Sequence, residues 1–190
     1  MKVNIKPNIN GDNYNPADYI YTPLVGDSVT GDTPLFVKND AEMAGLAEGV
    51  VGQGAPYFSS FFITISTGIG GCYIENKCIK QVSNEIGHTL FPYKGQYFEL
   101  EKIASGSGII RLAQLNHITL EHSSHMFERV RINDLAIFPV FQDWLRLISD
   151  FLQYIQKTFA PSIVIFTGGV MKSADVFLDE LKSRNPNVKM

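Results

Sequence analysis

The spacing of apolar residues predicts an α/β arrangement in the second half of the chain. Apolar side chains recur every three to four positions over 137–159, which predicts an amphipathic helix with one face on a core. The continuous apolar run at 162–166 predicts a strand buried on both faces, and Gly168–Gly169 then leads into a final helix over 173–181. Ligands bind at the carboxyl ends of strands in such folds, so we expect the turn after residue 166 to face a site.

The first half of the chain predicts a β-meander around a glycine-rich turn. Asn39 and Asp40 are expected to cap a helix over 41–51. Strands are expected at 34–38, 58–66, 71–75 and 78–80. Short helices are expected at 100–104 and 108–115, followed by a polar and mobile helix–loop region over 118–133. His117, His122 and His125 are expected on the surface of the chain, and residues 1–33 contain mostly turn signals.

Composition and charge narrow the class of protein. The 190 residues are 45% hydrophobic and 18% charged, as in an ordinary globular domain, and the net charge of −3 gives no basic footprint for nucleic acid. No apolar run approaches the roughly 20 residues that span a bilayer. The N-terminus lacks the apolar core of a signal peptide, so we expect a cytoplasmic protein. Cys72 and Cys78 are expected as free thiols.

The segment at 66–71 is the strongest candidate for chemistry. Gly68, Gly70 and Gly71 follow an apolar strand and leave backbone N–H groups unobstructed, which suits a phosphate-binding turn. A tight hairpin turn explains the same glycines, since glycine motifs alone are weak signals. An acid lies upstream at Asp40 and a carboxylate–imidazole pair lies downstream, which together indicate phosphoryl transfer to a small molecule that carries a hydroxyl group.

Each flanking group also has a structural interpretation. Asp40 is either a helix cap or a general base for an attacking hydroxyl. Glu85 and His88 form a solvated pair, a binding pair for vicinal sugar hydroxyls, or two ligands of an incomplete zinc site. Gly168 and Gly169 either pack the last helix closely on the sheet or let an adenine ring approach the backbone.

Four motifs in order resemble the ROK family of repressors and sugar kinases. They are Val37-Lys38-Asn39-Asp40-Ala41-x-x-Ala44, Thr67-Gly68-Ile69-Gly70-Gly71, Glu85-Ile86-Gly87-His88 and Leu100-Glu101-x-x-Ala104-Ser105-Gly106. The segment at 163–170 is similar to the family's adenosine segment. The resemblance implies an α/β fold: a ribonuclease H-like lobe, as in actin-like ATPases, with a mixed sheet flanked by helices. Residues 1–38 then form a remnant of the small lobe, and residues 39–190 form the large lobe.

The resemblance also implies roles for single residues. Asp40 matches the catalytic base, and Asn39 matches a sugar contact beside it. Further sugar hydroxyls are expected at Glu85, His88 and Glu101, and the nucleotide at Thr67, Gly68, Gly168 and Gly169. The implied activity is ATP-dependent phosphorylation of a hexose or N-acetylhexosamine, as by a glucokinase, with Mg²⁺ bound alongside ATP.

Two departures from the family pattern lead to two further expectations. Many ROK proteins carry a zinc-binding cysteine loop after the histidine, whereas the residues at 89–99 include no cysteine, so we expect no structural zinc and no protein metal ligands. The family's first phosphate loop, Asp-x-Gly-Gly-Thr, is absent from residues 1–33, and the chain stops shortly after the adenosine turn. We therefore expect little kinase activity from these 190 residues alone.

Two other classes of function remain open. One is a sugar-sensing regulator without catalysis, although no basic helix-turn-helix segment is present and the retained Asp40 favours a kinase. The other is a non-catalytic remnant in which apolar surface drives homo-oligomers. We expect neither nucleic acid nor a membrane as a partner.

Overall fold

A computed structural model of the protein describes residues 39–80 and 85–190. Residues Asp40–Met190 form one compact unit. The strand expected at 34–38 and the small-lobe remnant expected over 1–38 lie outside the described residues.

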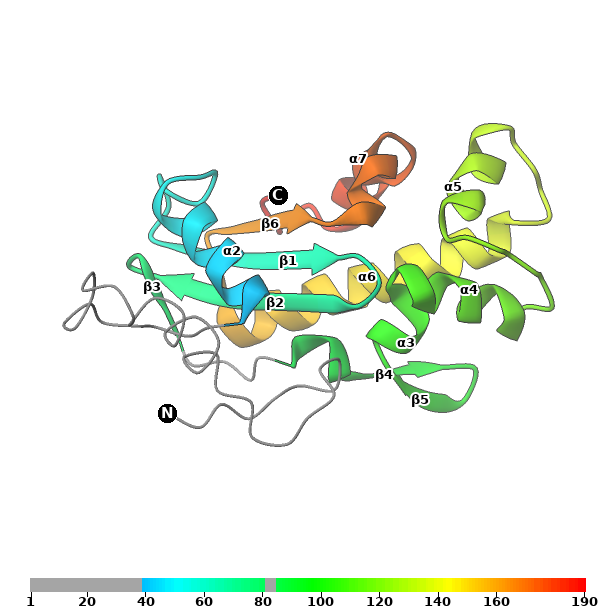
Figure 1. The fold of residues 1–190 in the computed structure, drawn as a ribbon, viewed down its shortest axis with the longest axis horizontal. Coiled ribbons are helices and arrows are strands. Elements are labelled where there is room, and N and C mark those ends of the chain that lie inside the picture. Colours follow the sequence, from blue (N-terminus) through cyan, green and yellow to red (C-terminus); the bar gives the residue numbers. More distant parts are fainter. Residues whose placement is uncertain (1–38, 81–84) are drawn as a thin grey trace, which may run out of the picture. The chain divides into compact units, whose positions relative to one another are not determined.

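A mixed sheet forms the centre of this unit (Figure 1). Its strands are β1 (Ser59–Ile65), β2 (Ile69–Glu75), β3 (Cys78–Ile79) and β6 (Ile163–Thr167), in the spatial order β3-β2-β1-β6. The first three strands pair antiparallel, which confirms the predicted meander, and β6 pairs parallel with β1. Because β1 and β6 are parallel neighbours, their carboxyl ends meet at the same edge of the sheet.

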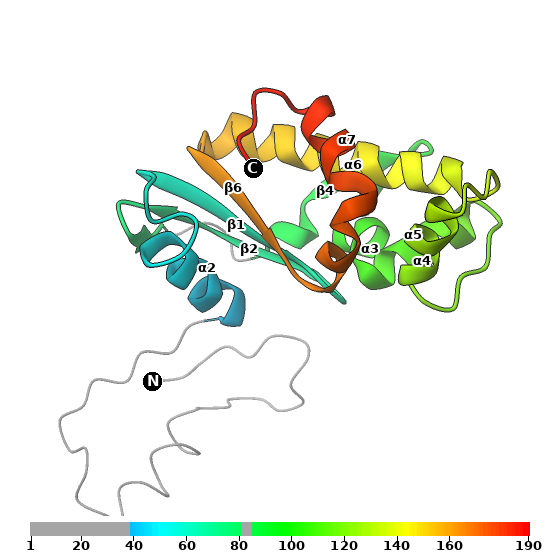
Figure 2. The same cartoon turned by 90° about the horizontal axis from the view of Figure 1, so that it is seen from above.

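Helices cover both faces of the sheet, as the α/β pattern predicts (Figure 2). Helix α2 (Asp40–Val50) packs on β1 and β2 on one face, and the long helix α6 (Phe138–Phe159) packs on the other. Alternation along β1 supplies both contacts: Phe61 and Ile63 belong to the main core with α6, whereas Phe62 joins a smaller cluster on the opposite face. This division fixes the register, since a one-residue slip would exchange the two faces.

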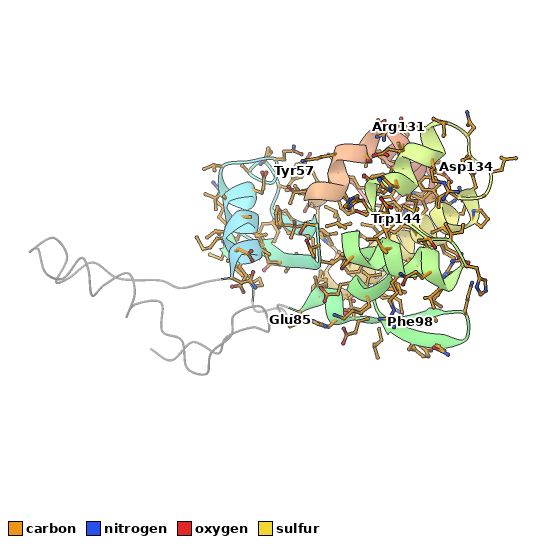
Figure 3. All side chains as sticks on the ribbon, turned by 45° about the vertical axis from the view of Figure 1, so that its right-hand side comes forward. Tyr57, Glu85, Phe98, Arg131, Asp134 and Trp144 are labelled. Carbon is orange, nitrogen blue, oxygen red and sulfur yellow. The ribbon has the colours of Figure 1, made fainter. Side chains whose placement is uncertain are left out.

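A group of short helices lies beyond the carboxyl ends of β1 and β6. They are α3 (Glu101–Ala104), α4 (Gly106–Leu115) and α5 (Ser124–Arg131), and the turn η2 (Gly169–Ser173) leads to α7 (Ala174–Arg184). Trp144 of α6 lies among them, fully buried, and its indole Nε1 donates a hydrogen bond to the carbonyl of Ala104 at 2.9 Å (Figure 3). The long helix α6 therefore holds the C-terminal end of α3 through this hydrogen bond.

The region at 118–133, expected to be a polar and mobile helix–loop segment, contributes buried apolar side chains to the core. Met126 and Phe127 of α5 are buried in the main core. On the outer side of the same helix, Arg131 donates two hydrogen bonds to Asp175 of α7, at 3.0 and 2.8 Å, which lowers the pKa of Asp175. The region contains an amphipathic helix of only about two turns. A helix this short does not show a clear three- to four-residue spacing of apolar residues in the sequence.

A β-hairpin that the sequence did not predict follows His88. It comprises β4 (Leu90–Tyr93) and β5 (Gln96–Glu99), and the short η1 helix (Ile86–His88) precedes it. The buried Tyr93 donates its hydroxyl to Asp143 of α6 at 2.7 Å and accepts a hydrogen bond from Asn116 at 2.6 Å. The hairpin is thus attached to α6 and to the end of α4 through one phenol.

We expect Tyr93→Phe to lower the free energy of unfolding by about 1 kcal/mol at neutral pH, because two hydrogen bonds are lost. Burial, and next the hydrogen bond to Asp143, raise the pKa of Tyr93 to about 12. The unfolded tyrosine ionises near pH 10, so the stability that depends on the neutral phenol is complete below pH 10 and is lost as the pH rises towards 12. Urea unfolding at pH 7, 10 and 11.5 should show a shallower loss in Tyr93→Phe than in wild type. Equal losses in the two proteins would contradict the proposed anchoring.

No helix within residues 39–80 and 85–190 is long and apolar enough to cross a membrane.

Candidate functional site

Asp40 stands at the start of α2, beside the glycine turn. It is exposed, and its Oδ1 accepts a hydrogen bond from the N–H of Ala41 at 2.8 Å. A Cβ added to Gly70 would lie 3.1 Å from the Cβ of Ala41, so the first turn of α2 lies directly over the start of β2. The helix N-terminus also favours a negative charge at this position. Asn39 immediately precedes the helix, as expected.

The turn between β1 and β2 is held from α4. The N–H of Gly106 donates to the carbonyl of Ser66 at 2.6 Å. Ser107 donates to the carbonyl of Thr67 from its N–H at 3.4 Å and from its Oγ at 2.6 Å. Within the described part of the chain, the N–H groups of Thr67 and Gly68 have no hydrogen-bond partner. The turn therefore has its carbonyl groups occupied and two amide donors available, as a site for an anion requires.

A second glycine turn lies beside the first. Thr64 of β1 is in register with Thr167 of β6, so the turns that follow these parallel strands share one edge of the sheet. Gly168 has a φ of +100°, and a Cβ added there would overlap the carbonyl oxygen of Ile65. A Cβ on Gly169, in contrast, would have no neighbour within 4 Å. Gly168 therefore lies close to the backbone at the end of β1, whereas the backbone at Gly169 is exposed. A role of either glycine in binding a nucleotide stays a prediction.

Glu101 connects the turn to a group of polar side chains. Its Oε2 accepts a hydrogen bond from the N–H of Ile69 at 3.3 Å, and a Cβ added to Gly68 would lie 2.8 Å from the same oxygen. Because Ser105 caps α4 directly after α3, residues 101–107 both carry this carboxylate and hold the glycine turn. Both the first turn of α2, at Ala41, and the carboxylate of Glu101 thus lie close to the glycine-rich segment.

The expected pair of Glu85 and His88 forms, with a third member. His88 Nε2 lies 3.2 Å from a Glu85 oxygen, and Nδ1 lies 3.0 Å from an oxygen of Glu99. All three side chains are partly exposed. Figure 3 labels Glu85, which precedes the hairpin in the chain, and Phe98, which lies on the hairpin. The Glu85–His88 pair could be predicted from its three-residue spacing, whereas Glu99 reaches His88 only through the register of the hairpin.

His88, Glu99 and Glu101 each offer one ligand atom, and these atoms lie within 4.8 Å of one another. They form the one group of three or more metal-ligating side chains found within residues 39–80 and 85–190. Structural zinc sites take four protein ligands, so this group offers one too few for such a site, although it could hold a more hydrated cation. The absence of zinc stays a prediction.

The remaining histidines do not join this group. His122 and His125 pack on each other at the start of α5, with ring centroids 5.2 Å apart, and His117 is exposed after α4. His117 and His122 lie on the surface as expected, and His125 is half-buried.

The sequence of the chain is similar to a family model and to several characterised proteins. A model described as the ROK family matches residues 6–188. The chain is 26% identical over 174 residues to a glucokinase of Halalkalibacterium halodurans, an alignment that covers 78% of this chain and 53% of the glucokinase. It is 25% identical over 162 residues to the xylose repressor of Bacillus subtilis, covering 80% of this chain and 42% of the repressor. It is 33% identical over 114 residues to an N-acetylmannosamine kinase of Haemophilus influenzae, covering 54% and 37% respectively.

The fold is also similar to that of solved protein structures. A ROK family glucokinase from Streptomyces griseus, solved with glucose and AMPPNP, matches with a TM-score of 0.73 and 23% identity, over 96% of this chain and 65% of that one. This similarity supports the fold of an actin-like ATPase lobe with a mixed sheet flanked by helices. The chain spans about half the length of the curated relatives that it matches.

Proposed function

Since the chain belongs to the ROK family, we propose that it forms the sugar site and the second phosphate turn of an ATP-dependent sugar kinase. The observation that carries the proposal is the hydrogen bond from the N–H of Ile69 to Glu101. It joins a carboxylate suited to a sugar hydroxyl to a glycine turn suited to a phosphate. Sugar kinases among the relatives, a glucokinase and an N-acetylmannosamine kinase, support a hexose or an N-acetylhexosamine as substrate.

In this proposal, Asp40 takes the proton from the attacking sugar hydroxyl. Its exposed carboxylate stands beside the glycine turn, where the acceptor and the phosphate must meet. Asn39 is next to Asp40 and supplies an amide for the same sugar. Glu85, His88 and Glu101 hold further hydroxyls, since carboxylates accept and imidazole either donates or accepts. Fixing the sugar in this way converts the transfer into a reaction between two oriented groups.

The nucleotide is proposed to lie along the two adjacent glycine turns. Thr67 and Gly68 offer free N–H groups to its phosphates, and the open backbone at Gly169 lets the rest of the nucleotide approach, while Gly168 holds the turn. Magnesium bound with the nucleotide would offset phosphate charge.

The similarity to a xylose repressor favours a second candidate function, a sugar-sensing lobe that does not transfer phosphate. A sensor uses the sugar contacts without a general base. The two functions therefore differ at Asp40, which a sensor does not need, and in the sugar that binds.

A binding assay tests the proposal without requiring turnover. We expect glucose, mannose or one of their N-acetyl derivatives to raise the melting temperature of the chain by several degrees, because a ligand at about 100 times its Kd adds roughly 2.7 kcal/mol to stability. Asp40→Asn should retain most of this shift, as one carboxyl oxygen is replaced by an amide of the same shape. A response to xylose alone would favour the sensor, and no response to any sugar would reject both.

A further inference from the structure

His88 is held between two carboxylates of different origin. Glu85 precedes it by three residues and lies 3.2 Å from Nε2, and Glu99 follows it by eleven residues and lies 3.0 Å from Nδ1. A carboxylate accepts hydrogen bonds only, so each contact needs a proton on the facing nitrogen, and the neutral ring can satisfy just one of them. Which carboxylate holds the ring therefore decides which nitrogen is available to a ligand.

Hairpin geometry favours Glu99 as the fixed partner. Glu99 pairs with Leu90 at the base of the hairpin, and the N–H of Leu100 donates to the carbonyl of Thr89 at 2.9 Å, which closes the chain back on the residue after His88. Tyr93 and Lys94 attach the other end, the latter through a hydrogen bond from Nζ to the carbonyl of Leu115 at 2.9 Å. Glu99 thus lies in a paired strand with both ends tied, whereas Glu85 precedes η1 and lies outside any helix or strand.

We propose that Glu99 is a positioning residue of the sugar site, which holds the imidazole of His88 through Nδ1 so that Nε2 is presented to a sugar hydroxyl beside Glu85. The inference rests on the proposed sugar site. The hydroxyl donates its proton to the unprotonated Nε2, and Glu85, which lies 3.2 Å from Nε2, accepts from a neighbouring hydroxyl of the same sugar. Glu101 offers a carboxylate oxygen within 4.8 Å of the ligand atoms of His88 and Glu99. The cysteine-free hairpin thereby fixes the ring through a carboxylate of its own.

The test combines sugar affinity with the state of the ring, both measured in EDTA because the group could hold a cation. In the sugar-free wild type, the ring ¹⁵N resonances of His88 should report a protonated and hydrogen-bonded Nδ1. Glu99→Ala should lose that signature and weaken binding of the best sugar about tenfold, the cost of one charge-assisted hydrogen bond. Glu99→Gln should restore most of both, since the amide oxygen also accepts from Nδ1. Gln96→Ala, on the exposed part of the same strand, should match wild type.

Three outcomes would overturn the proposal. In the first, sugar affinity in Glu99→Ala equals that of wild type. In the second, affinity falls while the Nδ1 resonance is unchanged, which would place Glu99 against the sugar itself. In the third, the wild-type chain binds no sugar but keeps the Nδ1 signature, which rejects the sugar site while leaving the pairing of Glu99 with His88 intact.

Discussion

Gly168→Ala is expected to lower the free energy of unfolding by about 3 kcal/mol, through strain at a positive φ and a steric clash. The residue has a φ of +100°, and an added Cβ would overlap the carbonyl oxygen of Ile65 at the end of the neighbouring parallel strand. The overlap involves backbone, so no side-chain rotation can relieve it. Urea unfolding measures the loss.

Gly169→Ala is the matched control for this change. It adds the same methyl group one residue later, where nothing lies within 4 Å and φ is not positive. Its stability should stay within about 0.5 kcal/mol of wild type. Equal losses of stability in the two variants would contradict the close approach of Gly168 to the backbone of Ile65.

Glu101→Gln is expected to weaken sugar binding about 30-fold, equivalent to about 2 kcal/mol, because a hydrogen bond to a carboxylate becomes one to a neutral amide. The glutamine keeps the shape of the side chain and an oxygen for the N–H of Ile69, so the fold should be preserved. Isothermal titration with the best-binding sugar measures the effect.

Glu128→Gln provides the control for Glu101→Gln. It makes the same change of charge on the exposed side of α5, away from the sugar contacts proposed above. Unchanged affinity in Glu101→Gln, or an equal decrease in Glu128→Gln, would mean that Glu101 does not contact the sugar.

Hydrophobic periodicity was sufficient for the framework of the fold. The three- to four-residue spacing over 137–159 predicted α6 to within one residue at its start, and the apolar run at 162–166 predicted β6 with a shift of one. Both elements are long or uniformly buried, so their patterns reflect one dominant environment. The short helix α5 and the hairpin at 90–99 have mixed environments, and their patterns were correspondingly weak.

In the candidate site too, some contacts could be predicted from the sequence and others could not. Contacts between residues close in sequence, such as Glu85 with His88, follow from spacing alone. The contacts of Ser107 with Thr67 and of Glu99 with His88 join segments 40 and 11 residues apart, so they depend on how α4 and the hairpin pack. Resemblance to the family predicted roles for Glu101 and Gly168. The structure adds the hydrogen bond of Glu101 to Ile69 and the close approach of Gly168 to Ile65, the last residue before the glycine turn.

One turn, between β1 and β2, is proposed to contact both the sugar site and the phosphate site. The most direct measurement is an amide ¹H–¹⁵N NMR titration of the chain, first with the best-binding sugar and then with a non-hydrolysable ATP analogue. Sugar should shift the Ile69 amide, whose N–H is bonded to Glu101, and the analogue should then shift Thr67, Gly68 and Gly169. An Ile69 resonance that stays fixed while sugar binds, or a turn that does not respond to the analogue, would contradict the account.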